Sequence, residues 1–198
     1  MKIIKATPKP ITFTGECASI CYDSKNDNPE KVYNRGLMCI KQNHGETSEF
    51  VDIIFETDDY SARCLRELLR HRHSSKLQAS TRYINYNNMD YYIPHSIENN
   101  NEAKESYEHL MKYINVKYQE FVDVYNIPKQ DAANILPLGM KSKVIFKCNL
   151  RELIHISKIR GKKPALPEIQ NLVGELLAEL NVIDEEWKTL CEWIRSEI

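Results

Sequence analysis

The clearest periodicity in the chain is an apolar stripe between Glu102 and Tyr125. Apolar residues recur there at steps of three and four: Tyr107, Leu110, Met111, Ile114, Tyr118, Phe121, Val122 and Tyr125. This spacing places them on one face of an α-helix, which predicts a long helix packed in the core. The polar run SIENNN, residues 96–101, precedes it and predicts a loop that caps the helix.

Two segments have patterns typical of β-strands. The segment FVDIIF, residues 50–55, is rich in β-branched and aromatic residues and predicts a buried strand. Between Gly139 and Cys148, the positions Val144, Phe146 and Cys148 alternate with Lys143, Ile145 and Lys147. This alternation predicts a strand that is covered on one face.

Helices are predicted between and after these strands. One runs from Tyr60 to Arg72 after a capping segment at 57–59, and a short one follows Pro128. Three more begin at Asn149, Pro167 and Asp184. The residues predicted to point inward are, in the first of these helices, Leu150, Leu153 and Ile154. In the second they are Ile169, Leu172, Val173, Leu176 and Leu180, and in the third Trp187, Leu190, Cys191 and Ile194. Helices and strands are mixed without regular βαβ alternation, so we expect an α+β fold.

Length and composition narrow the class of protein. With 198 residues, 42% of them hydrophobic and 28% charged, the chain fits one domain, residues 1–198. The sequence has no apolar run of the roughly 20 residues that a membrane helix needs, and its N-terminus does not read as a signal peptide. We therefore expect a cytoplasmic protein with no membrane partner. A formal net charge of −1 argues against a nucleic-acid partner and makes any basic site local.

The cysteines predict neither disulfides nor a metal site. They are scattered: Cys17, Cys21, Cys39, Cys64, Cys148 and Cys191. In a chain of this size without a secretion signal, we expect reduced thiols. Cys17 and Cys21 are expected on one helix face, but no second Cys or His pair matches them, so we expect no metal.

The segment RHRHSSKLQASTRY, residues 70–83, concentrates basic and hydroxyl side chains. One interpretation is structural, because cations at the C-terminal end of a helix complement its dipole. The other is a phosphate pocket, because paired arginine donors and hydroxyls suit a phosphate. A distant segment, NLRELIHISKIR at 149–160, repeats the chemistry: Arg151 and His155 share a helix face and Arg160 ends the helix.

These motifs resemble the flavin-dependent thymidylate synthases, the ThyX family. Arg70-His71-Arg72, seven further residues and Ser80 match the family signature RHR-x7-S, and Ser80 opens the STRY that follows. Other matching segments occur in the family's order: NHGETSEF at 43–50, ILP at 135–137, NLRE at 149–152, His155, Arg160 and PEI at 167–169. The similarity spans about residues 43–172, most of the chain.

The resemblance implies a fold, an activity and an assembly. The fold is ThyX-like, with a central, mainly antiparallel sheet flanked by helices. The activity is methylation of dUMP to dTMP with FAD as cofactor and with NADPH and 5,10-methylenetetrahydrofolate as co-substrates. The assembly is a homotetramer with active sites between subunits, so we expect the RHR segment and the 149–160 helix to meet across an interface.

The resemblance also implies roles for individual residues. Those implied to hold the flavin are Thr47, Glu49, Arg70, His71, Arg72, Gln78, Asn149, Arg151 and His155. Those implied to bind the nucleotide are Glu67, Arg70, Gln78, Ala79, Ser80, Thr81, Arg82 and Arg160. Arg160 is implied to activate the pyrimidine by drawing negative charge onto the ring, and Ser80 is the second catalytic candidate. A nucleophilic serine needs a base and an oxyanion hole, so a ligand-binding hydroxyl suits Ser80 better.

One departure keeps alternatives open. Family members carry an arginine in the pattern D-A-R…L-P, whereas this chain has Asp131-Ala132-Ala133. The loss of a charged hydrogen bond of this kind weakens the binding free energy of the nucleotide by about 1.5–3 kcal/mol. Lys141 or Lys143 could replace the missing charge. The alternatives are a flavin-dependent pyrimidine nucleotide hydroxymethylase, acting on dUMP or dCMP, and a non-enzymatic nucleotide-binding homologue.

Overall fold

The computed structural model describes residues 1–24 and 28–198. By its contacts the chain divides into two compact units. Unit 1 comprises Met1–Thr57, Leu69–Lys76 and Ile145–Ile198, and unit 2 comprises Asp58–Leu68 and Leu77–Val144. The single domain expected over residues 1–198 stays a prediction.

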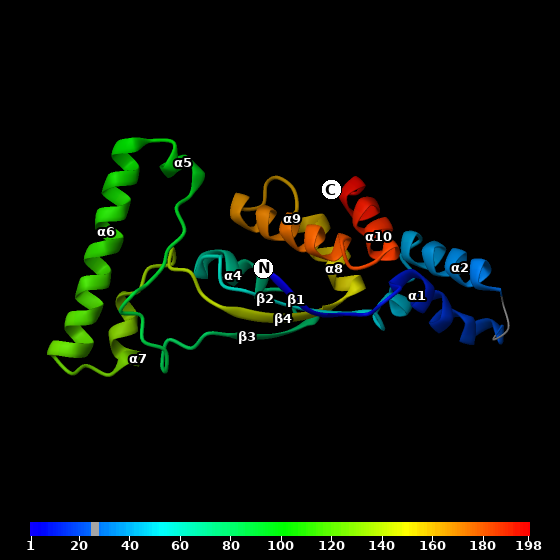
Figure 1. Cartoon of the computed structure of the whole chain (residues 1–198), viewed down its shortest axis with the longest axis horizontal. Coiled ribbons are helices and arrows are strands. Elements are labelled where there is room, and N and C mark those ends of the chain that lie inside the picture. Colours follow the sequence, from blue (N-terminus) through cyan, green and yellow to red (C-terminus); the bar gives the residue numbers. More distant parts are fainter. Residues whose placement is uncertain (25–27) are drawn as a thin grey trace. The chain divides into compact units, whose positions relative to one another are not determined.

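Unit 1 holds most of a four-stranded sheet and the helices that cover it (Figure 1). Its elements are β1 (Lys2–Ala6), α1 (Pro10–Ser19), the 3₁₀ helix η1 (Ile20–Tyr22), α2 (Pro29–Lys41), α3 (Gly45–Ser48), β2 (Asp52–Thr57), most of β3 (Ser74–Gln78), most of β4 (Val144–Asn149), α8 (Leu150–Arg160), α9 (Pro167–Asn181) and α10 (Glu185–Ser196). The strand order is β1-β2-β4-β3, and β1 runs antiparallel to β2. The expected α+β fold with a mainly antiparallel sheet is confirmed.

The two predicted strands form the centre of this sheet. Along β4, the residues Val144, Phe146 and Cys148 are buried as the alternation predicts. The strand predicted at 50–55 is β2, which begins at Asp52; Phe50 lies before it and is 63% exposed. The rings of Phe55 and Phe146 pack with centroids 5.4 Å apart, so the neighbouring strands β2 and β4 share one apolar core.

The three predicted C-terminal helices are present with their predicted caps. The side chain of Asn149 accepts the N–H of Glu152 at the start of α8, and that of Asp184 accepts two N–H groups at the start of α10. Pro167 is the first residue of α9, where its missing N–H costs nothing. Their predicted inward residues are buried, except for a half-buried Ile154.

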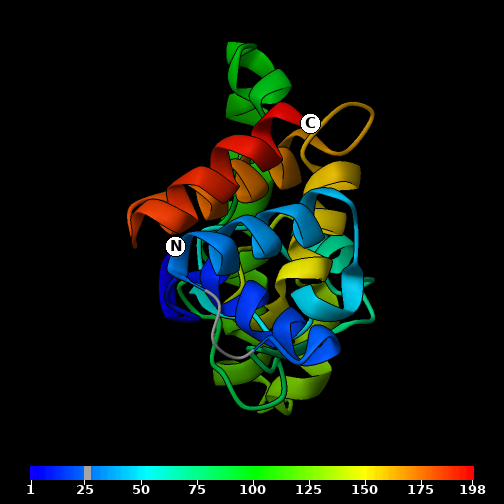
Figure 2. The same cartoon turned by 90° about the vertical axis from the view of Figure 1, so that its right-hand side faces the viewer.

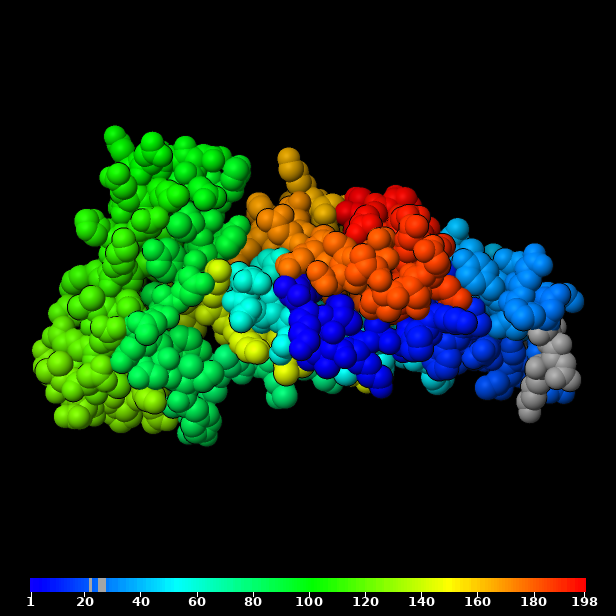
Figure 3. Space-filling model, in the orientation of Figure 1, coloured from blue at the N-terminus to red at the C-terminus, as the bar shows by residue number. Residues whose placement is uncertain are grey.

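The N-terminal segment is anchored to α10. Glu186 accepts the N–H groups of Ile11 and Thr12 at 2.8 Å each, which caps the start of α1. The indole N–H of Trp187 donates to the carbonyl of Thr7 at 2.9 Å. Figure 3 shows the resulting contact between the blue N-terminal residues and the red C-terminal helix.

Helices α1 and α2 lie in a stretch where the sequence predicts no element apart from a helix face shared by Cys17 and Cys21. They lie side by side, as Figure 2 shows in two shades of blue. A Cβ on Gly36 would come within 1.9 Å of the carbonyl oxygen of Ile11, so the helices approach at a distance that glycine alone permits. Helix α1 ends at Ser19, and therefore Cys21 lies in η1 and not on one helix face with Cys17, contrary to expectation. All six cysteines are free thiols, as expected.

Unit 2 contains the remaining elements and its own small core. They are α4 (Ala62–Leu68), α5 (His95–Glu98), α6 (Asn101–Gln119), the π-helix η2 (Glu120–Val124), α7 (Lys129–Ala132) and the 3₁₀ helix η3 (Ala133–Ile135). Met89, Met111 and Met140 form the buried centre, against which tyrosines pack. The hydroxyl of Ser61, just before α4, accepts the N–H of Cys64 at 3.1 Å, and capping by residues 57–59 stays a prediction.

The predicted long helix exists, but its apolar face is not a core face. In α6, Met111 and Tyr118 are buried, whereas Leu110 is 53% exposed and Tyr125, just beyond η2, is 56% exposed. The prediction that the whole stripe packs in the core is therefore wrong. Among the described residues, no helix has both the length and the apolar character to cross a membrane.

Candidate functional site

The sheet brings the two sequence motifs together within one chain. Strand β3 begins at Ser74, two residues after Arg72, and β4 ends at Asn149, where α8 begins. The strands are antiparallel neighbours, so the start of β3 lies beside the end of β4. The RHR segment therefore contacts α8 inside a single subunit. This corrects the expectation that the two meet across a subunit interface.

Between these segments lies a pocket of about 800 Å³, entirely within unit 1. Its lining residues are Asn43, Glu49, Arg70, His71, Arg72, His73, Asn149, Arg151, Glu152, Ile154, His155, Lys158, Ile159 and Arg160. Five of them are arginine or lysine and two are glutamate. The pocket is therefore strongly positive in a protein whose formal net charge is −1.

Most residues implied to hold the flavin line this pocket, and two do not. Glu49, Arg70, His71, Arg72, Asn149, Arg151 and His155 are among the lining residues. Thr47 is not; its hydroxyl donates to the carbonyl of His44 at 2.8 Å. Gln78 belongs to unit 2, where its amide donates to the hydroxyl of Ser142 at 3.1 Å. The individual roles remain predictions.

The Lys76 side chain satisfies two of the carbonyl groups that follow α4. The Lys76 ammonium donates to the carbonyl of Leu69 at 2.8 Å and to that of His71 at 2.6 Å. The hydroxyl of Ser74 also donates to the His71 carbonyl. Arg70 and Arg72 are exposed and line the pocket.

At the buried end of the pocket, His71 contacts Glu152 and Arg160. The Nδ1 atom of His71 is 2.9 Å from a carboxylate oxygen of Glu152, and both side chains are about 95% buried. The Nε group of Arg160 donates to Nε2 of His71 at 3.4 Å. Burial lowers the pKa of His71, and Arg160 and His155 lower it further; Glu152 opposes them. His71 is therefore neutral in the folded protein near neutral pH.

Arg151 is held at the opposite end by α3. Its guanidinium donates to the carboxylate of Glu49 at 2.6 Å. It also lies against Gly45: a Cβ there would come within 2.7–2.9 Å of three Arg151 side-chain atoms. Glycine at this position leaves room for the arginine to lie along the pocket wall.

Several lining residues escaped the sequence analysis. Lys158 and Ile159 follow Arg151 and His155 at helical spacing, so periodicity along α8 could have found them. Asn43 and Glu152 lie inside motifs that match the family, but their types alone assign no role. His73 is exposed and yet lines the pocket, which its position after RHR does not reveal.

The residues implied to bind the nucleotide lie in unit 2, apart from Arg70 and Arg160. Residues 74–78 form β3, and Ala79 continues the pairing through its N–H to the carbonyl of Lys143 at 2.8 Å. A turn follows, in which the carbonyl of Ser80 accepts N–H groups from residues 83 and 84. Arg82 donates to the Gln130 side chain at 3.3 Å.

The position of the missing family arginine is also in unit 2. Ala133 begins η3 and is half-buried. Lys141, one of the two candidates to replace the lost charge, forms an ion pair with Asp90 at 3.1 Å. Glu67 is half-buried in the last turn of α4.

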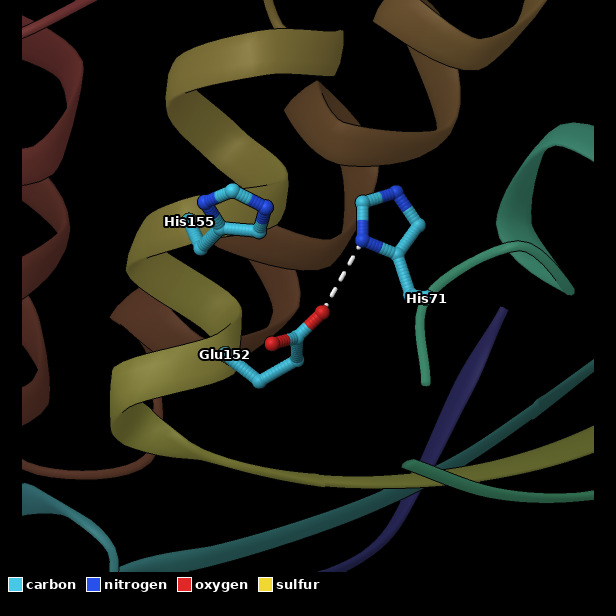
Figure 4. Close-up of side chains that lie close together, drawn as sticks. All are labelled: His71, Glu152 and His155. Carbon is cyan, nitrogen blue, oxygen red and sulfur yellow. Dashed lines mark hydrogen bonds and ion pairs between the residues drawn. The ribbon is translucent and has the colours of Figure 1, made fainter. Parts of the chain in front are cut away.

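The group of buried His71, buried Glu152 and exposed His155 also has side chains of metal-ligand types. Its potential ligand atoms lie within 4.8 Å of one another (Figure 4). However, Arg160 donates to His71 and four further cations line the same pocket. Because like charges repel strongly where water is scarce, this environment disfavours a divalent cation and favours an anionic ligand.

Comparisons with known proteins agree with the motif. The family model described as thymidylate synthase complementing protein matches residues 2–184. A flavin-dependent thymidylate synthase from Thermococcus onnurineus is 31% identical over 98% of this chain and 83% of the relative. The homologue from Clostridium tetani is 26% identical over 92% of this chain and 82% of the relative.

A solved structure has the same fold. Helicobacter pylori ThyX, crystallised with FAD and dUMP, superimposes with a TM-score of 0.77 at 21% identity and covers 97% of this chain and 96% of its own. The resemblance drawn from the motif is thereby confirmed, and the chain belongs to the family of flavin-dependent thymidylate synthases.

Proposed function

We propose that the protein methylates dUMP to dTMP as an FAD-dependent enzyme, with 5,10-methylenetetrahydrofolate as carbon donor and NADPH as reductant. The observation that carries the proposal is the positive pocket of unit 1, which both family motifs line. The choice of ligands is supported by the relatives, which are flavin-dependent thymidylate synthases, and by the FAD and dUMP in the Helicobacter pylori structure.

The pocket suits FAD in charge and size. FAD contains a diphosphate, and Arg70, Arg72 and Lys158 offer cations to it. Arg151 is already paired with Glu49, so its charge is partly neutralised and it serves as a fixed wall. A volume of about 800 Å³ is within the range of cofactor sites. Bound flavin, once reduced, supplies the hydride that completes the methyl group.

The chain's own residues activate the pyrimidine by electrostatics. Arg160 provides a guanidinium in a partly buried position, where it stabilises negative charge on the ring more strongly than it would in water. None of the six cysteines, all of which the structure describes, lines the pocket, so a covalent cysteine route has no nucleophile there. Cys39, Cys64, Cys148 and Cys191 are buried, and burial raises the pKa of Cys191 to about 12.

Nucleotide binding falls to Glu67 and to residues 78–82. The turn at Ser80–Arg82 carries two hydroxyls and a guanidinium, which are donor groups that suit a phosphate. The Ser80 hydroxyl accepts the N–H of Arg82 at 3.3 Å, a contact that fits a binding role.

The enzyme works as a homotetramer in this proposal. Its support is the exposed apolar face of α6, where Leu110, Tyr113 and Val116 are each more than half exposed at helical spacing. Surfaces of this kind usually become covered by another chain. The proposed location of the enzyme is the cytoplasm, where its six free thiols stay reduced. Light scattering on the purified protein tests the assembly; a monomer at micromolar concentration would contradict it.

The function is tested on purified protein. We expect a yellow protein with a flavin spectrum, dUMP-stimulated NADPH oxidation and dTMP as product by mass spectrometry. A colourless protein that takes up no FAD would refute the proposal and favour a non-enzymatic homologue. A hydroxymethylated nucleotide would instead favour the hydroxymethylase alternative that Ala133 motivates.

A further inference from the structure

Three side chains form a continuous chain of contacts at the buried end of the pocket. Glu152 projects from the first turn of α8 and meets His71, as Figure 4 shows. Nδ1 of His71 lies 2.9 Å from the Glu152 carboxylate, and Nε2 lies 3.4 Å from Nε of Arg160. Glu152 and Arg160 thus approach opposite nitrogens of one imidazole.

The two contacts together select one form of the ring. An arginine Nε–H can only donate, so Nε2 of His71 must hold a lone pair. The remaining proton is then on Nδ1, where it donates to the Glu152 carboxylate. In this form the imidazole of His71 is neutral, and the Glu152 carboxylate holds its proton on Nδ1.

Glu152 is itself fixed in place. It is 5% exposed, and its backbone N–H donates to the Asn149 side chain at 2.9 Å. Its position in the first helical turn also stabilises its negative charge through the helix dipole. A rigid carboxylate can therefore orient the imidazole, and the imidazole in turn can restrain the arginine.

We propose that Glu152 is a positioning residue for pyrimidine activation: it holds His71 as the Nδ1–H tautomer, whose Nε2 anchors the guanidinium of Arg160. This inference rests on the proposed function, because it assigns Glu152 a part in the same reaction. In this role Glu152 acts through His71 and Arg160. With Nε restrained, the guanidinium has one preferred orientation toward the pocket.

The groups facing His71 determine how pH affects this contact. From α8 these are Glu152, His155 and Arg160, and from its own segment Arg70, Arg72 and His73 line the same pocket. Glu152 raises the pKa of His71, whereas burial, Arg160 and His155 lower it. Protonation of Nε2 would replace the acceptor with a donor and release Arg160. Removing the carboxylate should therefore move the titration of His71 to lower pH.

The first experiment measures the protonation of the His71 ring directly. In protein labelled with ¹⁵N-histidine, we expect the His71 signals of the Nδ1–H tautomer above its titration. In Glu152→Gln we expect His71 to titrate at lower pH; Glu192→Gln, the same change at an exposed position of α10, should leave it unchanged. A wild-type ring protonated at Nε2, or a titration that Glu152→Gln does not move, would overturn the proposal.

The second experiment is a double-mutant cycle on kcat. We expect Glu152→Gln to lower kcat for dTMP formation about tenfold, as the loss of a charged hydrogen bond implies. In an Arg160→Ala background the same change should have almost no further effect, because Glu152 acts through Arg160. An equal loss in both backgrounds would indicate a merely structural role and refute the proposal.

The two experiments distinguish a failure of the proposed role of Glu152 from a failure of the proposed function. If Glu152→Gln does not fold, Glu152→Asp, which keeps the charge but shortens the reach, takes its place in the cycle. If the wild-type protein forms no dTMP, the proposed function fails, while the ¹⁵N experiment still decides whether Glu152 places the His71 proton.

Discussion

The two halves of the RHR-x7-S signature are held in contrasting ways. The first half, around His71, is in unit 1 and is fixed by buried contacts to residues 81 and 89 positions away in the sequence. The second half, residues 77–82, is in unit 2 and is largely exposed, with Leu77 75% exposed and Tyr83 beside it 74% exposed. We expect the His71 half to be organised before ligands bind, and the exposed half to gain order when a ligand or a neighbouring chain covers it.

The largest expected effect comes from the organised half. Arg160→Ala should lower kcat for dTMP formation about 10²–10³-fold, because it removes a charge aimed at the transition state. FAD binding should change little. Steady-state kinetics at saturating substrates measure the effect, with Lys162→Ala, an exposed cation just past α8, as the control. Unchanged kcat would show that Arg160 does not activate the ring.

The second prediction concerns the turn that presents His71. Lys76→Met should lower the free energy of unfolding by about 1.5–3 kcal/mol, because the ammonium donates charged hydrogen bonds to two carbonyl groups. Denaturant unfolding measures it. Lys5→Met is the matched control, since Lys5 is an exposed lysine on the other edge strand. Equal stability of the two variants would mean that the turn does not depend on Lys76.

The third prediction concerns the position of the Arg151 side chain beside Gly45. Gly45→Ala should displace the Arg151 side chain, which has no room beside a Cβ, and should weaken FAD binding about threefold to tenfold. The fold should tolerate the change because the displaced atoms belong to a long side chain. Gly174→Ala, with open space around its Cβ, is the control in a fluorescence titration of FAD. Identical FAD affinities would contradict a role for this contact.

The smallest effect is expected in the exposed half. Gln130→Ala removes the acceptor 3.3 Å from Nε of Arg82 and should raise KM for dUMP about twofold, since exposed contacts contribute little. An increase of tenfold or more would show that the nucleotide turn is as strongly pre-organised as the His71 end. The neighbouring Lys129→Ala tests whether any change in α7 has the same effect.

Local sequence information determined much of this protein. The caps at Asn149 and Asp184, the proline start of α9 and the alternation along β4 act over a few residues, so their patterns predicted the elements correctly. The signature RHR-x7-S and the 149–160 segment likewise identified the family and most pocket-lining residues.

The tertiary structure decided what each pattern faces. The α6 stripe is helical by its spacing, yet burial depends on what packs against it, and Leu110 stays exposed. Glu152 is an ordinary helix residue in the sequence and becomes significant because β3 and β4 are neighbours, which places His71 beside it. The spacing of apolar residues determines which side chains share one face of a helix or strand. Contacts between residues 81 positions apart depend instead on which strands pair in the sheet.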